Sequence, residues 1–489
     1  MIRSALLTLA VSVISAATAR AQTTCAAMSG FTAPDVKITA AAPLTDPVPL
    51  CKVEGVIGAE IRFAVWLPDA WNGKFVMGGQ GGFAGAVDSQ AIGYRGLQQG
   101  YAVAGTDTGH RADGIDGRWA LGHPERVVNY AHAAIHRVTA TAKTIVAARY
   151  GRPAGKAYFT GCSNGGRQAL IEAQRYPDDF DAILAGAPAQ DWRGLIATFL
   201  TITRAMYPDP ARTSTPTLSI ADQQAIRAAV LAACDKADGL ADGVMTDPST
   251  CRFDPKRLAC SGENQDGCLS PAEIAAVETI TKGPQLDGKP YFVGFPFGGE
   301  ADPAGWGGWL VGPGGAGAAR PTLAYAFGVD FARYFVAQNP TWSYTDFDLR
   351  RFTADMKDLQ PLLSPLDPDL SAFRRRGGKL LLYHGWSDAA LSPFMTTRYV
   401  DAVMAKDVGA KADVRLFMLP GVMHCGGGPG PDRVDWLGAL DAWAGGGHAP
   451  DELTAGFANG GGRKVCAYPK KAVFTGAGDG RSPDQFVCR

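Results

Sequence analysis

Apolar runs that predict β-strands alternate with helical segments over the first 190 residues or so of the chain. The strand-like runs lie at 61–67, 75–77, 101–105, 156–161 and 180–186, and helical periodicity is evident at 127–150 and 167–175. Strands that alternate with helices predict a parallel sheet. The alternation is lost near residue 189 and returns with apolar runs at 378–384 and 414–419. We therefore expect an α/β domain that a long insertion interrupts in sequence.

The insertion, residues 189–373, is rich in proline, glycine and tryptophan, as in Trp306-Gly-Gly-Trp309. Because it separates two halves of the predicted sheet, we expect it to form a lid over an active site. The predicted organisation is a signal peptide (1–21), the first part of the α/β domain (22–188), the lid (189–373) and the second part of the α/β domain (374–489).

A serine between two glycines stands where a predicted strand meets a predicted helix. Gly161-Cys-Ser-Asn-Gly165 fits the G-x-S-x-G nucleophile elbow, in which a sharp turn lifts a serine hydroxyl above the carboxyl end of a sheet. The motif alone is weak in a chain with 61 glycines, where an ordinary glycine-rich turn is the alternative. The flanking strand and helix favour Ser163 as a nucleophile.

An acid and a histidine follow Ser163 in the order serine, acid, histidine that α/β-hydrolases use. Asp388 lies just beyond the apolar run 378–384, and His424 follows the run 414–419. The other histidines fit less well: those at 110, 123, 132 and 136 precede the serine, His384 precedes the acid, and His448 follows a glycine run without a strand in front. We therefore predict an α/β-hydrolase fold with the triad Ser163, Asp388 and His424.

The segment Phe75–Gly85 is a strand that breaks into a glycine-rich loop ahead of the elbow, which predicts an oxyanion-hole amide, with a flexible turn as the alternative. No Gly-Lys-Ser/Thr follows, so a phosphate-binding loop is disfavoured. His132 and His136 have a zinc-like i, i+4 spacing, but the H-E-x-x-H glutamate is absent, so we expect packing or surface histidines. Asp107 and His110 are interpreted as a structural turn.

Residues 1–21 predict an export signal, with Arg3 before an apolar run and a small-x-small cleavage site at Ala19-Arg-Ala21. No other stretch has the roughly 20 apolar residues of a membrane helix, so we expect no membrane partner and a secreted or periplasmic protein. Lys+Arg and Asp+Glu number 47 each, which leaves no basic excess for nucleic acid.

Ten cysteines in a chain with an export signal predict disulfide bonds. Cys162 directly precedes Ser163 and Cys425 directly follows His424, so a bond between the two cysteines would bring nucleophile and base together. This pairing is a hypothesis, because sequence alone does not determine connectivity. The remaining cysteines are close in sequence as 25 and 51, 234 and 251, 260 and 268, and 466 and 488.

Three carboxylates at 235, 238 and 242, with glycines at 239 and 243, lie in a short segment of the insertion. Hard oxygen ligands on a loop that glycines allow to curl suit Ca²⁺, although the EF-hand pattern is not met. The alternative is an acidic surface turn. We favour a structural calcium ion, because closely spaced acids repel one another without a cation.

Three segments together resemble the tannase/feruloyl esterase family, which includes the mono(2-hydroxyethyl) terephthalate hydrolases. They are the elbow Gly-Cys-Ser-x-Gly-Gly-Arg at 161–167, Tyr-His-Gly-x-Ser-Asp at 383–388 and Pro-Gly-x-x-His-Cys-x-Gly-Gly-Pro-Gly at 420–430. The resemblance covers nearly the whole mature chain. It implies an α/β-hydrolase domain with a lid, a disulfide between the cysteines beside the catalytic serine and histidine, and the four other pairs given above.

The resemblance also implies roles for residues that the patterns alone leave open. The oxyanion hole would consist of the amides of Gly82 and Asn164. The family's lid calcium pattern, Asp-x-x-Asp-Gly-x-x-Asp-Gly, would give the ligands Asp235, Asp238 and Asp242, with Leu240 and Val244 at backbone-carbonyl positions.

The implied activity is two-step hydrolysis of small esters of aromatic acids, with feruloyl, galloyl and terephthaloyl groups as the candidates and no organic cofactor. Arg320 and Arg333 in the lid are candidates to meet a substrate carboxylate, with surface ion pairs as the alternative. A protein of another class, a non-catalytic exported binding protein for aromatic ligands, is the alternative function.

Overall fold

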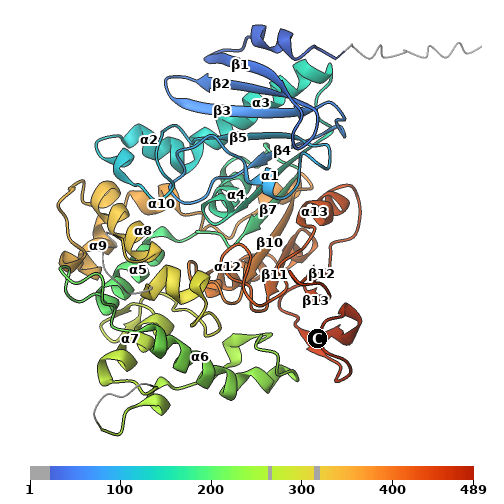
Figure 1. Ribbon diagram of the computed structural model, residues 1–489. Coiled ribbons are helices and arrows are strands. Elements are labelled where there is room, and N and C mark those ends of the chain that lie inside the picture. Colours follow the sequence, from blue (N-terminus) through green and yellow to red (C-terminus); the bar gives the residue numbers. More distant parts are fainter. Residues whose placement is uncertain (1–21, 263–266, 313–319) are drawn as a thin grey trace, which may run out of the picture.

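The computed structural model describes residues 22–262, 267–312 and 320–489, so the predicted signal peptide lies outside the described residues (Figure 1). A nine-stranded sheet has the strand order β1-β2-β3-β5-β4-β6-β7-β10-β11. Its strands are β1 (Val36–Leu44), β2 (Leu50–Ile57), β3 (Ile61–Pro68), β4 (Lys74–Gly78), β5 (Ala102–Thr106), β6 (Lys156–Cys162), β7 (Ala182–Gly186), β10 (Lys379–Gly385) and β11 (Val414–Leu419).

The six strands from β5 to β11 in this order pair in parallel, as the alternating pattern predicts. The prediction of a parallel sheet is wrong for the other edge, where β1, β2 and β3 pair antiparallel with one another and β3 pairs antiparallel with β5. The connections between β1, β2 and β3 are the short segments 45–49 and 58–60. A parallel crossover needs about a dozen residues or more, so these short turns permit only hairpins.

Both faces of the sheet are covered, because successive side chains of a strand point to opposite faces. Phe159 and Leu382 belong to one apolar core, together with side chains of α3, α4, α11 and α12. Tyr158 and Leu381 belong to the other core, with side chains of α1 and α13. The helices of this α/β domain are α1 (Gln90–Gly93), α2 (Pro124–Val128), α3 (Ala134–Tyr150), α4 (Asn164–Arg175), α11 (Ser371–Arg375), α12 (Pro393–Lys406) and α13 (Trp436–Ala444).

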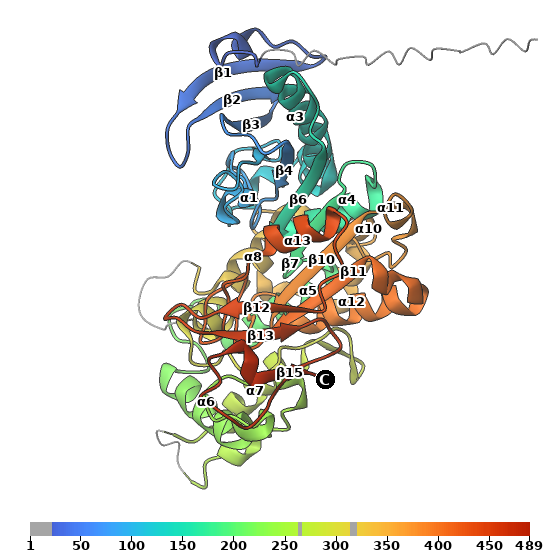
Figure 2. The same ribbon diagram turned by 90° about the vertical axis from the view of Figure 1, so that its right-hand side faces the viewer.

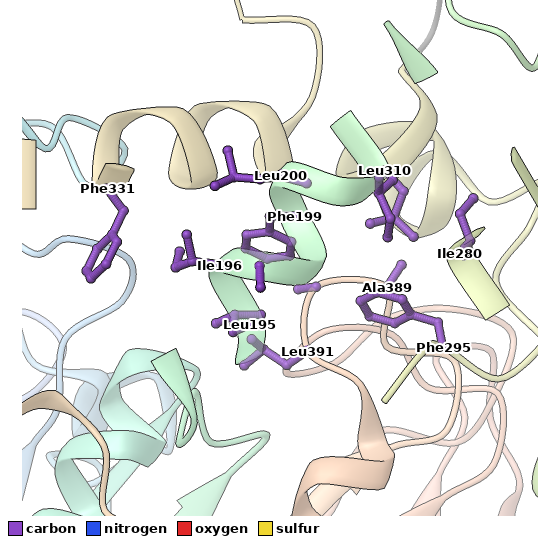
Figure 3. Close-up of a cluster of buried hydrophobic side chains, with 14 of the residues drawn as sticks. Leu195, Ile196, Phe199, Leu200, Ile280, Phe295, Leu310, Phe331, Ala389 and Leu391 are labelled. Carbon is purple, nitrogen blue, oxygen red and sulfur yellow. The ribbon is translucent and has the colours of Figure 1, made fainter. Parts of the chain in front are cut away.

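The insertion is mainly helical and lies at the opposite end of the molecule from β1 (Figure 1). Its elements are α5 (Trp192–Met206), α6 (Ile220–Cys234), α7 (Pro271–Lys282), the two-residue strands β8 (Gln285–Leu286) and β9 (Lys289–Pro290), a π-helical segment (Pro303–Val311), α8 (Leu323–Phe331), α9 (Leu349–Asp355) and α10 (Leu359–Leu363). One apolar core joins these helices to the α/β domain, since Phe83 and Leu391 belong to the same cluster as Phe199 of α5. Figure 3 shows Leu195 of α5 beside Leu391 in this cluster.

The C-terminal strands pack against the insertion and not only against the sheet. These strands are β12 (Glu452–Gly456), β13 (Gly462–Cys466), β14 (Ala472–Phe474) and β15 (Phe486–Cys488), and Figure 2 shows them next to the insertion. Ion pairs connect Arg463 to Asp242 and Lys471 to Asp247. No helix among the described residues is long and apolar enough to cross a membrane.

All ten cysteines lie within the described residues, and all are paired. The bonds are Cys25–Cys51, Cys162–Cys425, Cys234–Cys251, Cys260–Cys268 and Cys466–Cys488. These are the pairs that the resemblance implies.

Candidate active site

Ser163 forms the turn between the end of β6 and the first residue of α4, as the elbow motif predicts. Its backbone has φ 64° and ψ −124°, a conformation that is costly for a side-chain-bearing residue and typical of functional sites. Backbone bonds hold the turn: the Ser163 amide donates to the Gly186 carbonyl at 3.0 Å, and the Ser163 carbonyl accepts from Arg167 and Ala189 at 3.0 Å each.

The two motif glycines are needed for space. A Cβ on Gly161 would lie 2.5 Å from the backbone of Gly165, and a Cβ on Gly165 would lie 2.1 Å from Oε1 of Gln90. Real Cβ atoms do not approach other atoms this closely, so a larger residue at 161 would push strand β6 away from α4, and one at 165 would displace the side chain of Gln90 in α1. The packing of the elbow thus explains the spacing of the motif.

Asp388 and His424 are hydrogen-bonded in the arrangement that the triad prediction requires. Nδ1 of His424 and Oδ2 of Asp388 are 2.8 Å apart, and because a carboxylate only accepts, the imidazole donates from Nδ1. The other ring nitrogen, Nε2, is then the one that can take a proton. Ser163 and His424 line the same pocket.

The carboxylate of Asp388 is 1 % exposed and accepts hydrogen bonds on both oxygens. Oδ1 accepts from the amides of Ala390 and Leu391 at 2.8 and 2.9 Å. Oδ2 accepts from His424 and also lies 3.2 Å from Nε2 of His384, a fully buried residue. Burial would raise the pKa of Asp388, but the charge of His424 and hydrogen bonds from both histidines outweigh burial and hold the pKa below its ordinary value. Asp388 is therefore ionised at neutral pH.

The Cys162–Cys425 disulfide connects the residue before Ser163 to the residue after His424, with a Cα–Cα distance of 5.9 Å. The two cysteines are 263 positions apart in sequence. The bond fixes the end of β6 to the loop after β11, which keeps the serine and the histidine on one side of the sheet.

Gly82 and Asn164, the residues that the resemblance implies for the oxyanion hole, both line the pocket at Ser163. Asn164 is the first residue of α4, so its amide has no acceptor within the helix. Gly82 has φ 53°, and a Cβ there would lie 2.3 Å from the Gly114 carbonyl. The Gly82 carbonyl accepts from the Tyr130 hydroxyl at 2.8 Å, which orients the loop.

Arg167 is hydrogen-bonded to the residue that follows Ser163 and so supports the elbow. No role was assigned to Arg167 from the sequence. It is fully buried, and its Nε donates to Oδ1 of Asn164 at 2.7 Å. Its other nitrogens donate to the carbonyls of Tyr130, Ala131 and Leu363. Burial lowers the pKa of Arg167 to about 10, so the group still carries its charge at neutral pH. The arginine of the Gly-Gly-Arg motif thus orients Asn164 beside Ser163.

The pocket at Ser163 is built from apolar and aromatic side chains. Its walls are Ala189, Trp192, Leu195, Ile196, Phe199, Trp309, Phe327, Ala390 and Leu391. The cavity between them is small, about 30 Å³. The ring of Trp309 contacts the imidazole of His424 edge-on, with 5.1 Å between ring centroids, and stacks on Phe327 at 6.0 Å. The sequence singled out Trp309 only as part of an aromatic-rich insertion, because its place beside His424 depends on the tertiary fold.

Arg320 and Arg333 are not among the pocket-lining residues. Arg320 donates to the Ile115 carbonyl and forms an ion pair with Asp330 at 2.9 Å. Arg333 donates to the Trp342 carbonyl at 2.7 Å. The alternative given above, a surface ion pair, agrees with the contacts of Arg320, whereas Arg333 bonds to a backbone carbonyl.

Three of the histidines that the sequence left aside, His110, His132 and His136, have structural partners. His110 is buried, stacks on Trp119 with 3.7 Å between ring centroids and donates from Nε2 to the Phe83 carbonyl. His132 lies 2.6 Å from the Tyr176 hydroxyl, and His136 is paired with Asp179.

The carboxylates of Asp235, Asp238 and Asp242 lie in one loop but are partly satisfied by the protein itself. Backbone amides donate to each of the three, and Asp242 is also paired with Arg463. Oδ1 of Asp235 is buried and has no hydrogen-bond partner in the described structure. Burial and the charges of Asp242 and Asp238 raise the pKa of Asp235. Among the described residues, no group of three or more His, Cys, Asp or Glu side chains is arranged to hold a metal ion. A cation here would therefore need backbone oxygens in addition.

The amino-acid sequence matches the family model described as tannase and feruloyl esterase over residues 46–489. It is 32% identical to the mono(2-hydroxyethyl) terephthalate hydrolase of Piscinibacter sakaiensis, covering 90% of this chain and 84% of that protein. It is 34% identical to a probable feruloyl esterase of Arthroderma benhamiae, covering 88% of this chain and 83% of that protein. A crystal structure of an esterase from Aspergillus oryzae superimposes with a TM-score of 0.84 at 25% identity, covering 95% of this chain and 99% of that one.

These matches extend over both parts of the α/β domain and the insertion between them. The chain has an α/β-hydrolase fold and is a carboxylic ester hydrolase of the tannase and feruloyl esterase family.

Proposed function

We propose that this protein is an exported serine esterase that cleaves esters of aromatic acids through an acyl-enzyme. The observation that carries the proposal is the hydrogen-bonded pair His424–Asp388 in the pocket that Ser163 also lines. The family and the relatives named feruloyl esterase and mono(2-hydroxyethyl) terephthalate hydrolase support the aromatic acyl group. The aromatic walls of the pocket are suited to such a ring.

In the first step, the Ser163 hydroxyl attacks the ester carbonyl and His424 accepts its proton at Nε2. Asp388 holds the imidazole in the tautomer with the proton on Nδ1 and stabilises the imidazolium that forms. The oxyanion receives hydrogen bonds from the amides of Gly82 and Asn164, each of which is worth about 10²–10³ in turnover. His424 then protonates the leaving alcohol, and water repeats the sequence on the acyl-enzyme.

The test is a Ser163→Ala variant assayed with methyl ferulate. We expect kcat to fall on the order of 10⁵-fold, because the nucleophile is lost. The melting temperature should stay within about 2 °C, since the strained elbow is kept and only one hydroxyl is removed. Turnover at more than a tenth of the wild-type rate would rule out Ser163 as the nucleophile.

Export is part of the proposal. The ten paired cysteines suit an oxidising compartment outside the cytoplasm. Periplasmic or culture-medium protein should begin near residue 22, and recovery of the intact chain from the cytoplasm alone would contradict export.

A structural calcium ion at the loop of Asp235, Asp238 and Asp242 is a second part of the proposal. The buried Oδ1 of Asp235, which has no partner in the described structure, supports it. The backbone carbonyls of Leu240 and Val244 would add ligands. If calcium binds, chelation with EGTA should lower the melting temperature, and calcium but not magnesium should restore it. A melting curve that neither treatment moves would exclude the ion.

A further inference from the structure

The pocket beside Ser163 has no fixed charge in its walls, and this has a consequence for the acyl group. We infer that the protein hydrolyses esters of uncharged aromatic acids and rejects an acyl ring that carries a second, ionised carboxylate. The inference rests on the proposed function and divides its candidate substrates: the terephthalate half-esters are excluded, and neutral benzoyl- or cinnamoyl-type esters remain.

The position of the ring follows from the position of the serine. The carbonyl carbon of the substrate must reach Ser163 and the oxyanion amides, so a ring joined to it directly or through a vinyl group lies among the walls of the same pocket. One wall is α5, which contributes Leu195, Ile196 and Phe199 at helical spacing. Figure 3 shows Leu195 of α5 beside Leu391, which also lines the pocket.

The remaining walls are equally apolar. Trp309 and Phe327 stack on each other, and Ala390 and Leu391 complete the lining. The polar groups of the lining are those of Ser163, Asn164 and His424, which have roles in the proposed ester chemistry, and the indole N–H groups of Trp192 and Trp309, which are uncharged donors. None of the described lining residues is a lysine or an arginine.

The two arginines of the insertion that were candidates to meet a substrate carboxylate have partners within the protein. Arg320 is paired with Asp330, and Arg333 donates to the Trp342 carbonyl. Residues 313–319, which follow the π-helical segment of Trp309 in sequence, are all proline, glycine or alanine and therefore include no cationic side chain. A carboxylate on the ring would therefore enter the pocket without a counter-ion.

The free-energy cost of placing an ionised carboxylate in this pocket is large compared with the effect that uncharged ring substituents have on the rate. An ionised group transferred from water to an apolar site without a partner loses its hydration and gains no hydrogen bonds. The penalty applies to the transition state as well as to the bound substrate, so kcat/KM falls about tenfold for each ~1.4 kcal/mol of penalty.

The experiment compares two substrates that differ in one charge, dimethyl terephthalate and monomethyl terephthalate, at pH 7.5. Each kcat/KM is expressed per ester group and divided by the rate constant of alkaline hydrolysis of the same ester, which removes the difference in intrinsic reactivity. Because the carboxylate is smaller than the methyl ester, a steric effect alone would favour the half-ester. Methyl 4-methylbenzoate serves as a second uncharged ester.

We expect the normalised kcat/KM of monomethyl terephthalate to be lower by about 100-fold or more than that of either uncharged ester. A normalised kcat/KM of monomethyl terephthalate within about 3-fold of that of the uncharged esters would overturn the inference. The esterase assignment would not be affected. If that value were also lost on replacing Arg333 (Arg333→Gln), the arginine would be the carboxylate receptor. Cleavage of none of the aromatic esters would overturn the proposed function and the inference together.

Discussion

The Cys162–Cys425 disulfide is expected to contribute to catalysis as well as to stability, and the two contributions can be separated. The perturbation is the double variant Cys162→Ala/Cys425→Ala, which removes the only covalent connection that the structure gives between the serine turn and the histidine loop. Both cysteines adjoin a residue of the proposed triad, so the effect on turnover should exceed that of removing a remote disulfide.

The effect on stability follows from the length of the loop that the bond closes. A separation of 263 residues gives a chain-entropy contribution of about 5.5 kcal/mol at 25 °C. The smaller disulfides within that loop shorten it by about a tenth, which changes the value by about 0.1 kcal/mol. Measured effects usually fall short of this model, so we expect a loss of about 3–5 kcal/mol. With an unfolding entropy of about 2.1 cal/mol/K per residue over about 470 residues, the melting temperature should fall by about 3–5 °C.

Removing the disulfide should lower the rate because it changes the position of His424 relative to Ser163. Without the bond, the loop that carries His424 can move relative to β6, and a displacement of about 1 Å is enough to cost about 10²-fold in rate. We expect kcat to fall by about 10–100-fold while KM changes little, because the pocket walls are untouched.

A matched control is the variant Cys466→Ala/Cys488→Ala, whose bond closes a 22-residue separation between C-terminal strands. The same model gives it a stability contribution of about 3.4 kcal/mol. Calorimetry and steady-state kinetics with methyl ferulate, at least 15 °C below the melting temperature of each variant, measure both effects. Equal kcat values for the two double variants would refute the role of the Cys162–Cys425 bond in positioning the triad.

Two further predictions follow from the charges in and near the site. Asp388→Asn should lower kcat by about 10³–10⁴-fold, because the amide cannot hold the Nδ1–H tautomer of His424 in the same way; near wild-type turnover would contradict the role of Asp388. Burial is the main cause that lowers the pKa of His110 from 6.5 to about 4, so the unfolded state binds more protons and stability falls as the pH drops from about 6.5 to 4, by about 3 kcal/mol in total. His110→Gln should flatten the dependence of the melting temperature on pH in that window, and an unchanged slope would contradict this account.

The catalytic residues can be predicted from the sequence where they belong to a short motif or directly follow a recognisable strand. The elbow is a short motif whose glycine spacing reflects contacts within a few residues, as the close approach of Gly161 to Gly165 shows. The order of Ser163, Asp388 and His424 follows from the order of the parallel strands that carry them. Such features need only strand periodicity and a motif.

Strands β1 and β2 of the antiparallel edge were not predicted, and for β1 the burial pattern explains why. All nine residues of β1 are exposed or half-buried, so the strand lacks the continuous apolar run that marks a buried strand. The pocket walls were also not predicted. Trp309, Phe327 and Leu391 come from three segments that are apart in sequence, and no local pattern indicates that they meet at His424.

Residues 389–391 contact both the proposed catalytic acid and the helices of the insertion, and this limits how the insertion can move. The amides of Ala390 and Leu391 donate to Asp388, while their side chains, with that of Ala389, belong to the apolar core that holds α5 and α8. A shift of the helices against this loop would disturb packing and the hydrogen bonds to the carboxylate at once. Since the core is close-packed and contiguous, such a shift costs far more than the movement of an exposed flap. The part of the insertion around α5 is therefore a fixed wall of the active site, and substrate must enter past it rather than displace it.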